Sequence, residues 1–161
     1  MRLHTAGSAD AYRSRFQRKI SVNARIARAV TVGTSGANCG EPGTPAWNEL
    51  LTYESASVAK FYETVFGYEE EPVVSADFDY VSLHIDGRPV AGIHGVGTAL
   101  PRDRGPHWIT YFEVADTDEA VVRLVDLGGH VLKSPRDSAH GRVATVADPE
   151  GARFSLLESP R

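Results

Sequence analysis

The stretch FEVADTDEAVVRLVDLGGHV, residues 112–131, contains the end of one strand, a capped helix and the start of another strand. Asp116 or Thr117 can cap the helix, because a short polar side chain accepts hydrogen bonds from the free N–H groups of the first turn. The acids at 118–119 suit the positively polarised helix start, and the glycines at 128–129 end the helix. This order predicts a β-α-β unit.

The sequence on either side extends this unit. HWITYFEV, residues 107–114, predicts the strand that precedes the helix. HVLKSP, GRVATVAD and ARFSLLES predict three strands after it, with a turn at residues 148–151 between the last two. The second half of the chain is therefore predicted to be βαβββ.

The preceding residues repeat the same order. AWNELLTY, residues 46–53, predicts a strand, and SASVAKFYETVFG, residues 55–67, predicts an amphipathic helix. Ser55 or Ser57 can cap that helix, and the glycine at its end can stop it. EEEPVVS, DYVSLHIDG and RPVAGIHGV predict three more strands, the last two joined by an Asp-Gly hairpin.

We therefore predict an α+β fold of two tandem βαβββ modules. Each module is a four-stranded mixed sheet with one helix on one face, and the opposite faces enclose a concave cavity. Side chains alternate along a strand, so the pattern also predicts which residues face the cavity. We expect a ligand pocket lined by Trp47, Glu49, Tyr80, His84, His94, His107, Ile109, Tyr111, Arg153 and Ser155.

The chain divides into three segments. Residues 1–44 form a basic N-terminal extension with a Gly/Pro-rich linker, residues 45–101 the first module and residues 102–161 the second. Residues 1–40 carry seven basic side chains and one acid. Such an extension is typical of a mobile tail or one packed on the acidic body, an anion-binding segment or a transit peptide.

Composition excludes several functions. Residues 41–161 carry ten basic and twenty acidic side chains, which argues against nucleic-acid binding. The sequence shows no apolar run long enough to cross a membrane and no secretory signal. The single cysteine, Cys39, excludes an intrachain disulfide and agrees with a cytoplasmic location.

The two modules resemble the vicinal-oxygen-chelate superfamily, which includes glyoxalase I, bleomycin-resistance proteins and extradiol dioxygenases. The motifs are SVAKFYETVFGYE in the first module, and FEVADTDEAVVRLVDLGGHV with DPEGARFSLLE in the second. PAWNELLT, RPVAGI, PHWITYFEV and GRVATVADPEGARFSLLE are most similar to the hydroxylase-like, 27-kDa-antigen-like subgroup. The resemblance covers about residues 44–160 and implies the fold more specifically than the reaction.

The resemblance also implies where a metal would bind. Metal-dependent members take one His, Glu or Gln ligand from the first and last strand of each module. The matching positions here are Trp47, Gly92, Ile109 and Ser155. None of these residues suits such a site, so we expect neither a metal nor another cofactor.

An alternative site lies two residues away along the same strands. Glu49, His94 and His107 share strand faces with three of those positions, and His84 is predicted nearby. These residue types suit a displaced metal site, although all would shift along their strands by about 6–7 Å. Glu49 and His94 are also the candidate catalytic residues, because a His–carboxylate pair can act as a general base.

Three functional hypotheses follow. The first is a metal-free protein that binds a small organic molecule between its sheets, as bleomycin-resistance proteins do. The second is an enzyme of the same superfamily, of lyase, dioxygenase or hydroxylase type, with a displaced metal or a His/Glu acid–base site. The third is a protein-interaction scaffold. The resemblance implies a homodimer, and we expect no nucleic-acid or membrane partner.

Overall fold

The computed structural model describes residues 40–73 and 78–160. Its elements follow the predicted order twice. The first module contains β1 (Pro45–Thr52), α2 (Ala56–Phe66), β2 (Glu69–Val73), β3 (Asp79–Ile85) and β4 (Arg88–Gly95), followed by a short 3-10 turn, η1 (Gly97–Ala99). The second module contains β5 (His107–Glu113), α3 (Thr117–Asp126), β6 (His130–Ser138), β7 (Gly141–Ala147) and β8 (Arg153–Glu158).

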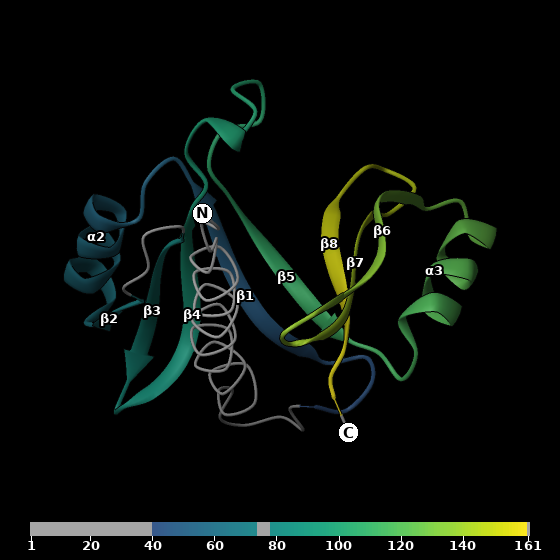
Figure 1. Cartoon of the computed structure of the whole chain (residues 1–161), viewed down its shortest axis with the longest axis horizontal. Coiled ribbons are helices and arrows are strands. Elements are labelled where there is room, and N and C mark those ends of the chain that lie inside the picture. The colour runs from purple at the N-terminus through teal and green to yellow at the C-terminus, as the bar shows by residue number, and fades with distance from the viewer. Residues whose placement is uncertain (1–39, 74–77, 161) are drawn as a thin grey trace, which may run out of the picture.

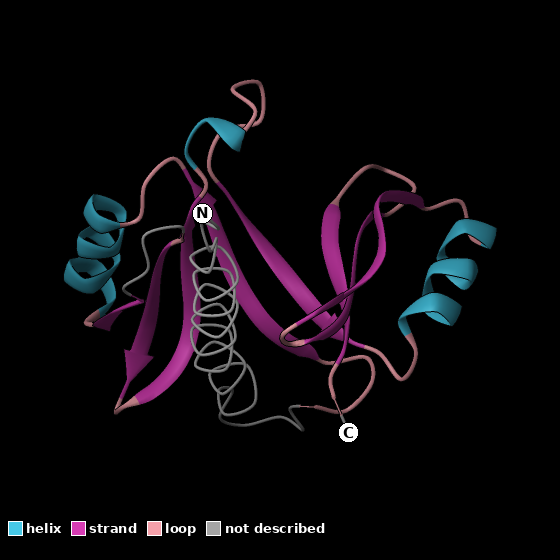
Figure 2. Cartoon of the chain, in the orientation of Figure 1, coloured by secondary structure: helices cyan, strands magenta, loops and turns pink. Residues whose placement is uncertain are grey.

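The two modules share one eight-stranded mixed sheet. Its strand order is β2-β3-β4-β1-β5-β8-β7-β6, with β1 and β5 antiparallel at the junction. Within the modules, β1 runs parallel to β4, and β5 runs parallel to β8. The sheet is open and curved, with both helices on its outer side (Figures 1 and 2). The predicted α+β class and module order are confirmed.

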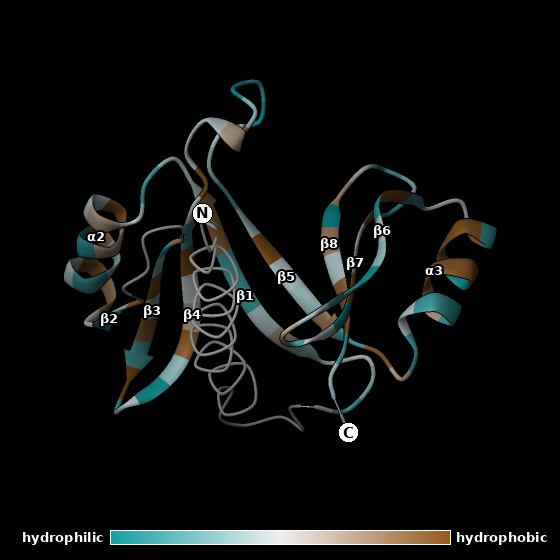
Figure 3. Ribbon diagram, viewed as in Figure 1, coloured by the Kyte–Doolittle hydropathy of each residue, from teal (hydrophilic) through white to brown (hydrophobic). Residues whose placement is uncertain are grey.

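Each helix packs on its own half of the sheet. Ala59 of α2 is fully buried against Val81, Leu83 and Ile93. Ala120 of α3 packs in a second cluster of buried residues with Ala144, Val146 and Leu156. Val81, Leu83 and Leu156 therefore face the helices. Figure 3 shows a hydrophilic segment followed by a hydrophobic one along β1, and a hydrophobic segment within β5.

The helix ends agree only partly with their predicted caps. Asp116 accepts a hydrogen bond from Glu119 N at 2.8 Å, and Gly67 ends α2 in the left-handed conformation. Ser55 occupies the N-cap of α2 but makes no capping bond. Its hydroxyl and N–H both bind the Asp79 carboxylate, which ties the helix start to β3.

The apolar pattern of α2 only partly describes a core face. Val58 and Tyr62 pack on the core, but Phe61, Val65 and Phe66 are 59%, 53% and 59% exposed. The helix buries a narrow stripe around Ala59, because it lies against the sheet at its small residue. The outer aromatic side chains therefore stay on the surface.

The predicted Asp-Gly hairpin is present, and an acidic strand forms one edge of the sheet. Asp86 and Gly87 join β3 to β4, both with positive φ, as the tight hairpin requires. At one edge of the sheet, β2 carries Glu69, Glu70 and Glu71, which are exposed. In the part of the chain that the structure describes, no helix is long and apolar enough to span a membrane.

Candidate functional site

A cavity of about 820 Å³ lies on the inner side of the sheet. The central strands β1, β4, β5 and β8 contribute to its lining, together with β6 and the turn that follows it. The lining includes eight of the ten residues predicted from strand alternation: Glu49, Tyr80, His94, His107, Ile109, Tyr111, Arg153 and Ser155. The other two, Trp47 and His84, lie outside it.

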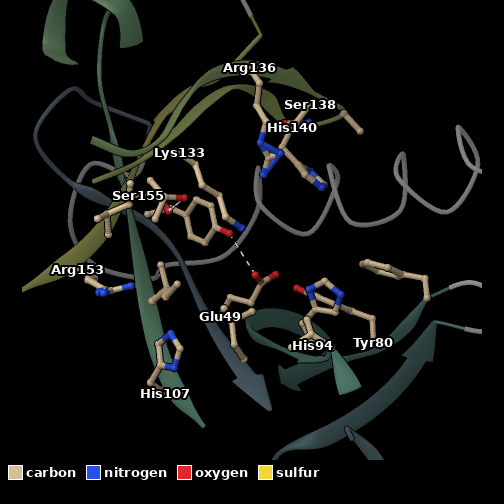
Figure 4. Close-up of a pocket in the computed structure, with 18 of the residues that line it drawn as sticks. Glu49, Tyr80, His94, His107, Lys133, Arg136, Ser138, His140, Arg153 and Ser155 are labelled. Atoms are coloured by element: carbon tan, nitrogen blue, oxygen red, sulfur yellow. Dashed lines mark hydrogen bonds between the residues drawn. The ribbon is translucent and has the colours of Figure 1, made fainter. Parts of the chain in front are cut away.

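Glu49 is the central polar group of this cavity (Figure 4). The Tyr111 hydroxyl donates a hydrogen bond to Glu49 Oε2 at 3.1 Å. Burial raises the pKa of Glu49 to about 7, and the opposing effects of the Tyr111 and Tyr80 hydroxyls and of Lys133 are smaller. The carboxyl group therefore holds its proton about half the time at neutral pH.

Aromatic rings form the wall beside Glu49. Phe78 and Tyr80 stack with ring centroids 5.3 Å apart, and the His94 ring lies 4.6 Å from Phe78. Burial lowers the pKa of His94, so its imidazole is neutral at pH 7. Because His94 makes ring contacts here and Glu49 is bonded to Tyr111, the structure does not form the His94–Glu49 pair that the sequence suggested.

Trp47 is buried behind this wall. Its indole Nε1 donates a hydrogen bond to the Tyr80 hydroxyl at 3.3 Å, and the side chain is 4% exposed. Trp47 shares its side of β1 with Glu49 by strand alternation, but it does not line the cavity. The residue therefore supports the wall.

His84 was expected in the pocket but does not line the cavity. The pairing of β3 with β4 shifts between Leu83 and His84. His84 Nε2 lies 3.3 Å from a carboxylate oxygen of Glu71, on the edge strand β2. That shift adds a residue to β4 and not to β3. His84 pairs with Glu69 of β2, so it lies near the sheet edge, outside the cavity lining.

The four positions that the superfamily uses for a metal do not fit one. Trp47 donates a hydrogen bond to Tyr80, Ile109 contributes an aliphatic side chain to the lining, and Ser155 carries a buried hydroxyl group. At Gly92, an added Cβ would fall inside contact distance of the Tyr80 hydroxyl. Tyr80 thus fills the space that a ligating side chain at position 92 would need.

The residues of the displaced set are not grouped around one point in the described part of the chain. Glu49, His94 and His107 all line the cavity, but no three His, Cys, Asp or Glu side chains in the described residues are grouped to share an ion. His107 Nδ1 instead contacts the Gly105 carbonyl at 2.8 Å. The cavity therefore contains a carboxyl group surrounded by hydroxyl groups and aromatic rings.

The strand β6 contributes residues that the sequence did not predict. Lys133, Arg136 and the following His140 line the cavity, and Figure 4 shows Lys133 extending toward Glu49. The sequence predicted a strand only to residue 135, whereas β6 reaches Ser138 and is irregular on both sides of Lys133. The only sequence signal was the presence of basic residues between 130 and 140.

Two polar atoms of the lining have no protein partner. His107 Nε2 and His140 Nδ1 are buried and make no hydrogen bond within the described part of the chain. Buried polar atoms are nearly always paired with protein, water or another molecule. The cavity therefore offers unused hydrogen-bonding positions on both sides of Glu49.

Comparison with known proteins assigns the family. The sequence pattern of the glyoxalase-like domain matches residues 47–157, which is most of the chain. The chain belongs to the glyoxalase-like family. This confirms the resemblance to the vicinal-oxygen-chelate superfamily, and the match covers both modules of the glyoxalase-like domain.

Two relatives have related sequences. The glyoxalase-like domain is 37% identical over 119 residues to the anthracycline biosynthesis protein DauV of Streptomyces sp. strain C5. It is 34% identical over 122 residues to CFP32 of Mycobacterium tuberculosis, a protein named as a glyoxylase. Both alignments cover 74% of this chain, but 42% and 47% of the relatives. The chain therefore spans less than half the length of these relatives.

Solved structures share the fold. A hypothetical protein from Bacillus halodurans superposes with a TM-score of 0.58 at 12% identity, covering 75% of this chain and 97% of that one. A methylmalonyl-CoA epimerase from Streptomyces coelicolor gives 0.54 at 21%, covering 75% of this chain and 100% of that one. At these identities the likeness establishes the glyoxalase-like fold alone.

Proposed function

We propose that this glyoxalase-like domain binds a small, planar organic molecule in its inner cavity. The observation that carries the proposal is a cavity of about 820 Å³ in which an aromatic wall faces a few polar groups. Small-molecule sites have this volume range and this mixture, in which rings supply contact area and polar atoms fix orientation. The unpaired atoms of His107 and His140 are two such groups.

The relatives favour a polycyclic aromatic molecule. One of them is named for anthracycline biosynthesis, and anthracyclines contain a flat anthraquinone ring system. The Phe78–Tyr80 stack and the His94 ring offer a surface against which such a ring can lie. Because the chain covers only part of that relative, the proposal is limited to binding by this domain.

The test is a calorimetric titration with 1,8-dihydroxyanthraquinone. We expect saturable binding with one site per chain. Leu51→Trp and Thr145→Trp each place an indole in the cavity lining, from opposite halves of the sheet. We expect each to weaken binding at least tenfold, because the added ring occupies the space of the probe.

The matched control is Val122→Trp, which adds the same ring at an α3 position that is 60% exposed. It should leave binding unchanged. Equal binding by all four proteins, or no binding by the folded parent protein, would reject the cavity as the site.

Glu49 supports a second function, acid–base catalysis. A general base works best when its pKa is near the working pH, and burial raises the pKa of Glu49 to about 7. The Tyr111 hydroxyl at 3.1 Å fixes one carboxyl oxygen. We propose that Glu49 accepts a proton from an acidic C–H or O–H group of a bound molecule, whereas the neutral His94 orients its ring.

Anthrone tests this catalytic proposal, because it is planar and its C10–H is acidic. Glu49 would remove the C10 proton and leave an enolate, which takes up a deuteron from heavy water at C10. We expect exchange, followed by NMR without oxygen, to rise with pH through about pH 7, since the ionised carboxylate is the base. Glu49→Gln should lower the rate about 100-fold or more.

A comparison with His94→Ala separates the two candidate bases. The proposal requires that His94→Ala retain most of the exchange rate, and that Glu49→Gln still bind anthrone. Loss of exchange only in His94→Ala would assign the base to His94. An unchanged rate in Glu49→Gln would exclude Glu49.

The predictions of a homodimer and of an interaction scaffold stay predictions. Residues 1–39, which carry the basic side chains of the N-terminal extension, lie outside the described residues. The outer face of α2 does expose Phe61 and Phe66, but its occupant is not indicated. Cavity binding is therefore the function that the described residues support best.

A further inference from the structure

The charge around the cavity is strongly unbalanced. Four cationic side chains line it: Arg104, Lys133, Arg136 and Arg153. Its acids are Glu49 and Asp137. Asp137 is already paired with Arg142 at 2.9 Å, and Glu49 is about half protonated at neutral pH. The domain as a whole is acidic, so a cationic lining on its inner face is a local feature.

Two of these cations are brought to the cavity by irregular strand pairing. Lys133 pairs with Thr145 and Arg136 with Val143, so three steps along β6 match two steps along β7. In a regular strand, residues three apart point to opposite faces. The extra residue of the bulge places both side chains on the face of Thr145, which also lines the cavity.

These cations have no counterion in the described residues. None of the four side chains forms an ion pair or a hydrogen bond with another residue of ranges 40–73 and 78–160. Lys133 acts on Glu49 and His94, and Arg136 on Tyr111, through the electrostatic field only. The remaining sequence holds only two acids, Asp10 and Asp77.

We infer that the molecule bound in the cavity is an aromatic acid, whose anionic group lies between Lys133 and Arg136 and whose ring lies against Tyr80 and His94. This inference rests on the proposed function and names the chemical class of its ligand. Arg136 supplies a planar guanidinium suited to a carboxylate or phenolate, and Lys133 adds a compact charge. The unpaired Nδ1 of His140 lies in the same hairpin and can add a hydrogen bond.

The test uses two probes that differ in charge but hardly in shape. Anthraquinone-2-carboxylate and anthraquinone-2-carboxamide are titrated calorimetrically at pH 8 and low salt. We expect the acid to bind at least tenfold more tightly than the amide. That preference should shrink as salt is raised, because salt screens exposed charges.

Substitutions then locate the anionic group. Lys133→Met and Arg136→Met should each weaken binding of the acid about fivefold to tenfold and change binding of the amide less than twofold. Arg123→Met is the control, since Arg123 lies on α3, outside the lining, and is 61% exposed. It should change neither affinity.

The outcomes separate this inference from the proposed function. If both probes bind equally, or if the substitutions weaken both equally, the cavity binds planar molecules but the anionic class is wrong. If neither probe binds the folded protein at millimolar concentration, the inference and the proposed function both fail. Tighter binding of the acid that survives both substitutions would also overturn the assignment to Lys133 and Arg136.

Discussion

Glu49 determines the chemistry available to the cavity, and its burial has a consequence for stability. Its pKa rises from 4.5 to about 7 on folding. The folded protein therefore binds this proton more tightly than the unfolded chain does. It follows that the free energy of unfolding falls as the pH rises from about 4.5 to about 7.

Glu49→Gln removes this pH dependence. Between pH 5 and pH 8 we expect the parent protein to lose about 2–3 kcal/mol that the variant keeps, because one pKa unit corresponds to about 1.4 kcal/mol. Urea unfolding at the two pH values measures the difference. Glu119→Gln, at an exposed α3 site, is the control and should follow the parent protein. A parallel pH response in Glu49→Gln would show that Glu49 titrates normally.

Gly92 and Tyr80 lie close together at a position that the resemblance assigns to a metal ligand. An alanine at position 92 would place its Cβ against the Tyr80 hydroxyl. We expect Gly92→Ala to cost about 1–3 kcal/mol in the free energy of unfolding, the usual cost of overpacking.

Tyr80→Ala provides the partner for a double-mutant cycle. In that background the added methyl group meets no phenol, so Gly92→Ala should cost much less, with a coupling energy of about 1 kcal/mol or more. Strict additivity of the two substitutions, measured by urea unfolding, would show that Tyr80 does not fill this space.

The helix α3 can be tested through its cap. Asp116 accepts the Glu119 N–H at 2.8 Å, so Asp116→Ala should lower the free energy of unfolding by about 1 kcal/mol. Asp126→Ala removes an acid from the last residue of the same helix, where the helix dipole disfavours it. It should be neutral or slightly stabilising. Equal losses in both variants would contradict the capping role.

Regular strands could be predicted from sequence, and irregular ones could not. Period-two alternation correctly placed His107, Ile109 and Tyr111 on the inner face of β5. Alternation fails where pairing shifts, because one extra residue moves the following side chains to the other face. For that reason Lys133 was missed, because β6 carries an extra residue on each side of it. His84 keeps the alternation of β3 but lies beside the edge strand β2, outside the cavity lining.

The spacing of apolar residues predicted the helix α2 but not which of its side chains are buried. The spacing in residues 55–67 predicted α2 correctly, but spacing alone does not say how deep the helix lies on the sheet. Contact with the sheet at Ala59 left Phe61 and Phe66 outside the core. The caps at Asp116 and Gly67 were predictable because they depend on local backbone geometry.

At the scale of the whole molecule, the repeat in the sequence accounts for the cavity. Two modules join through the antiparallel pair β1 and β5, so their inner faces form one curved surface. The resemblance places the metal positions of the superfamily on this surface. In this chain those positions are Trp47, Gly92, Ile109 and Ser155, and the Tyr80 hydroxyl occupies the space beside Gly92. What remains is a polar, cationic pocket around Glu49.

A crystal structure of the protein with anthraquinone-2-carboxylate tests this account most directly. We predict density for the probe in the cavity, with its ring beside Tyr80 and His94 and its carboxylate between Lys133 and Arg136. Density for the probe at the outer face of α2, near Phe61 and Phe66, or an empty cavity under conditions that saturate binding in solution, would contradict it.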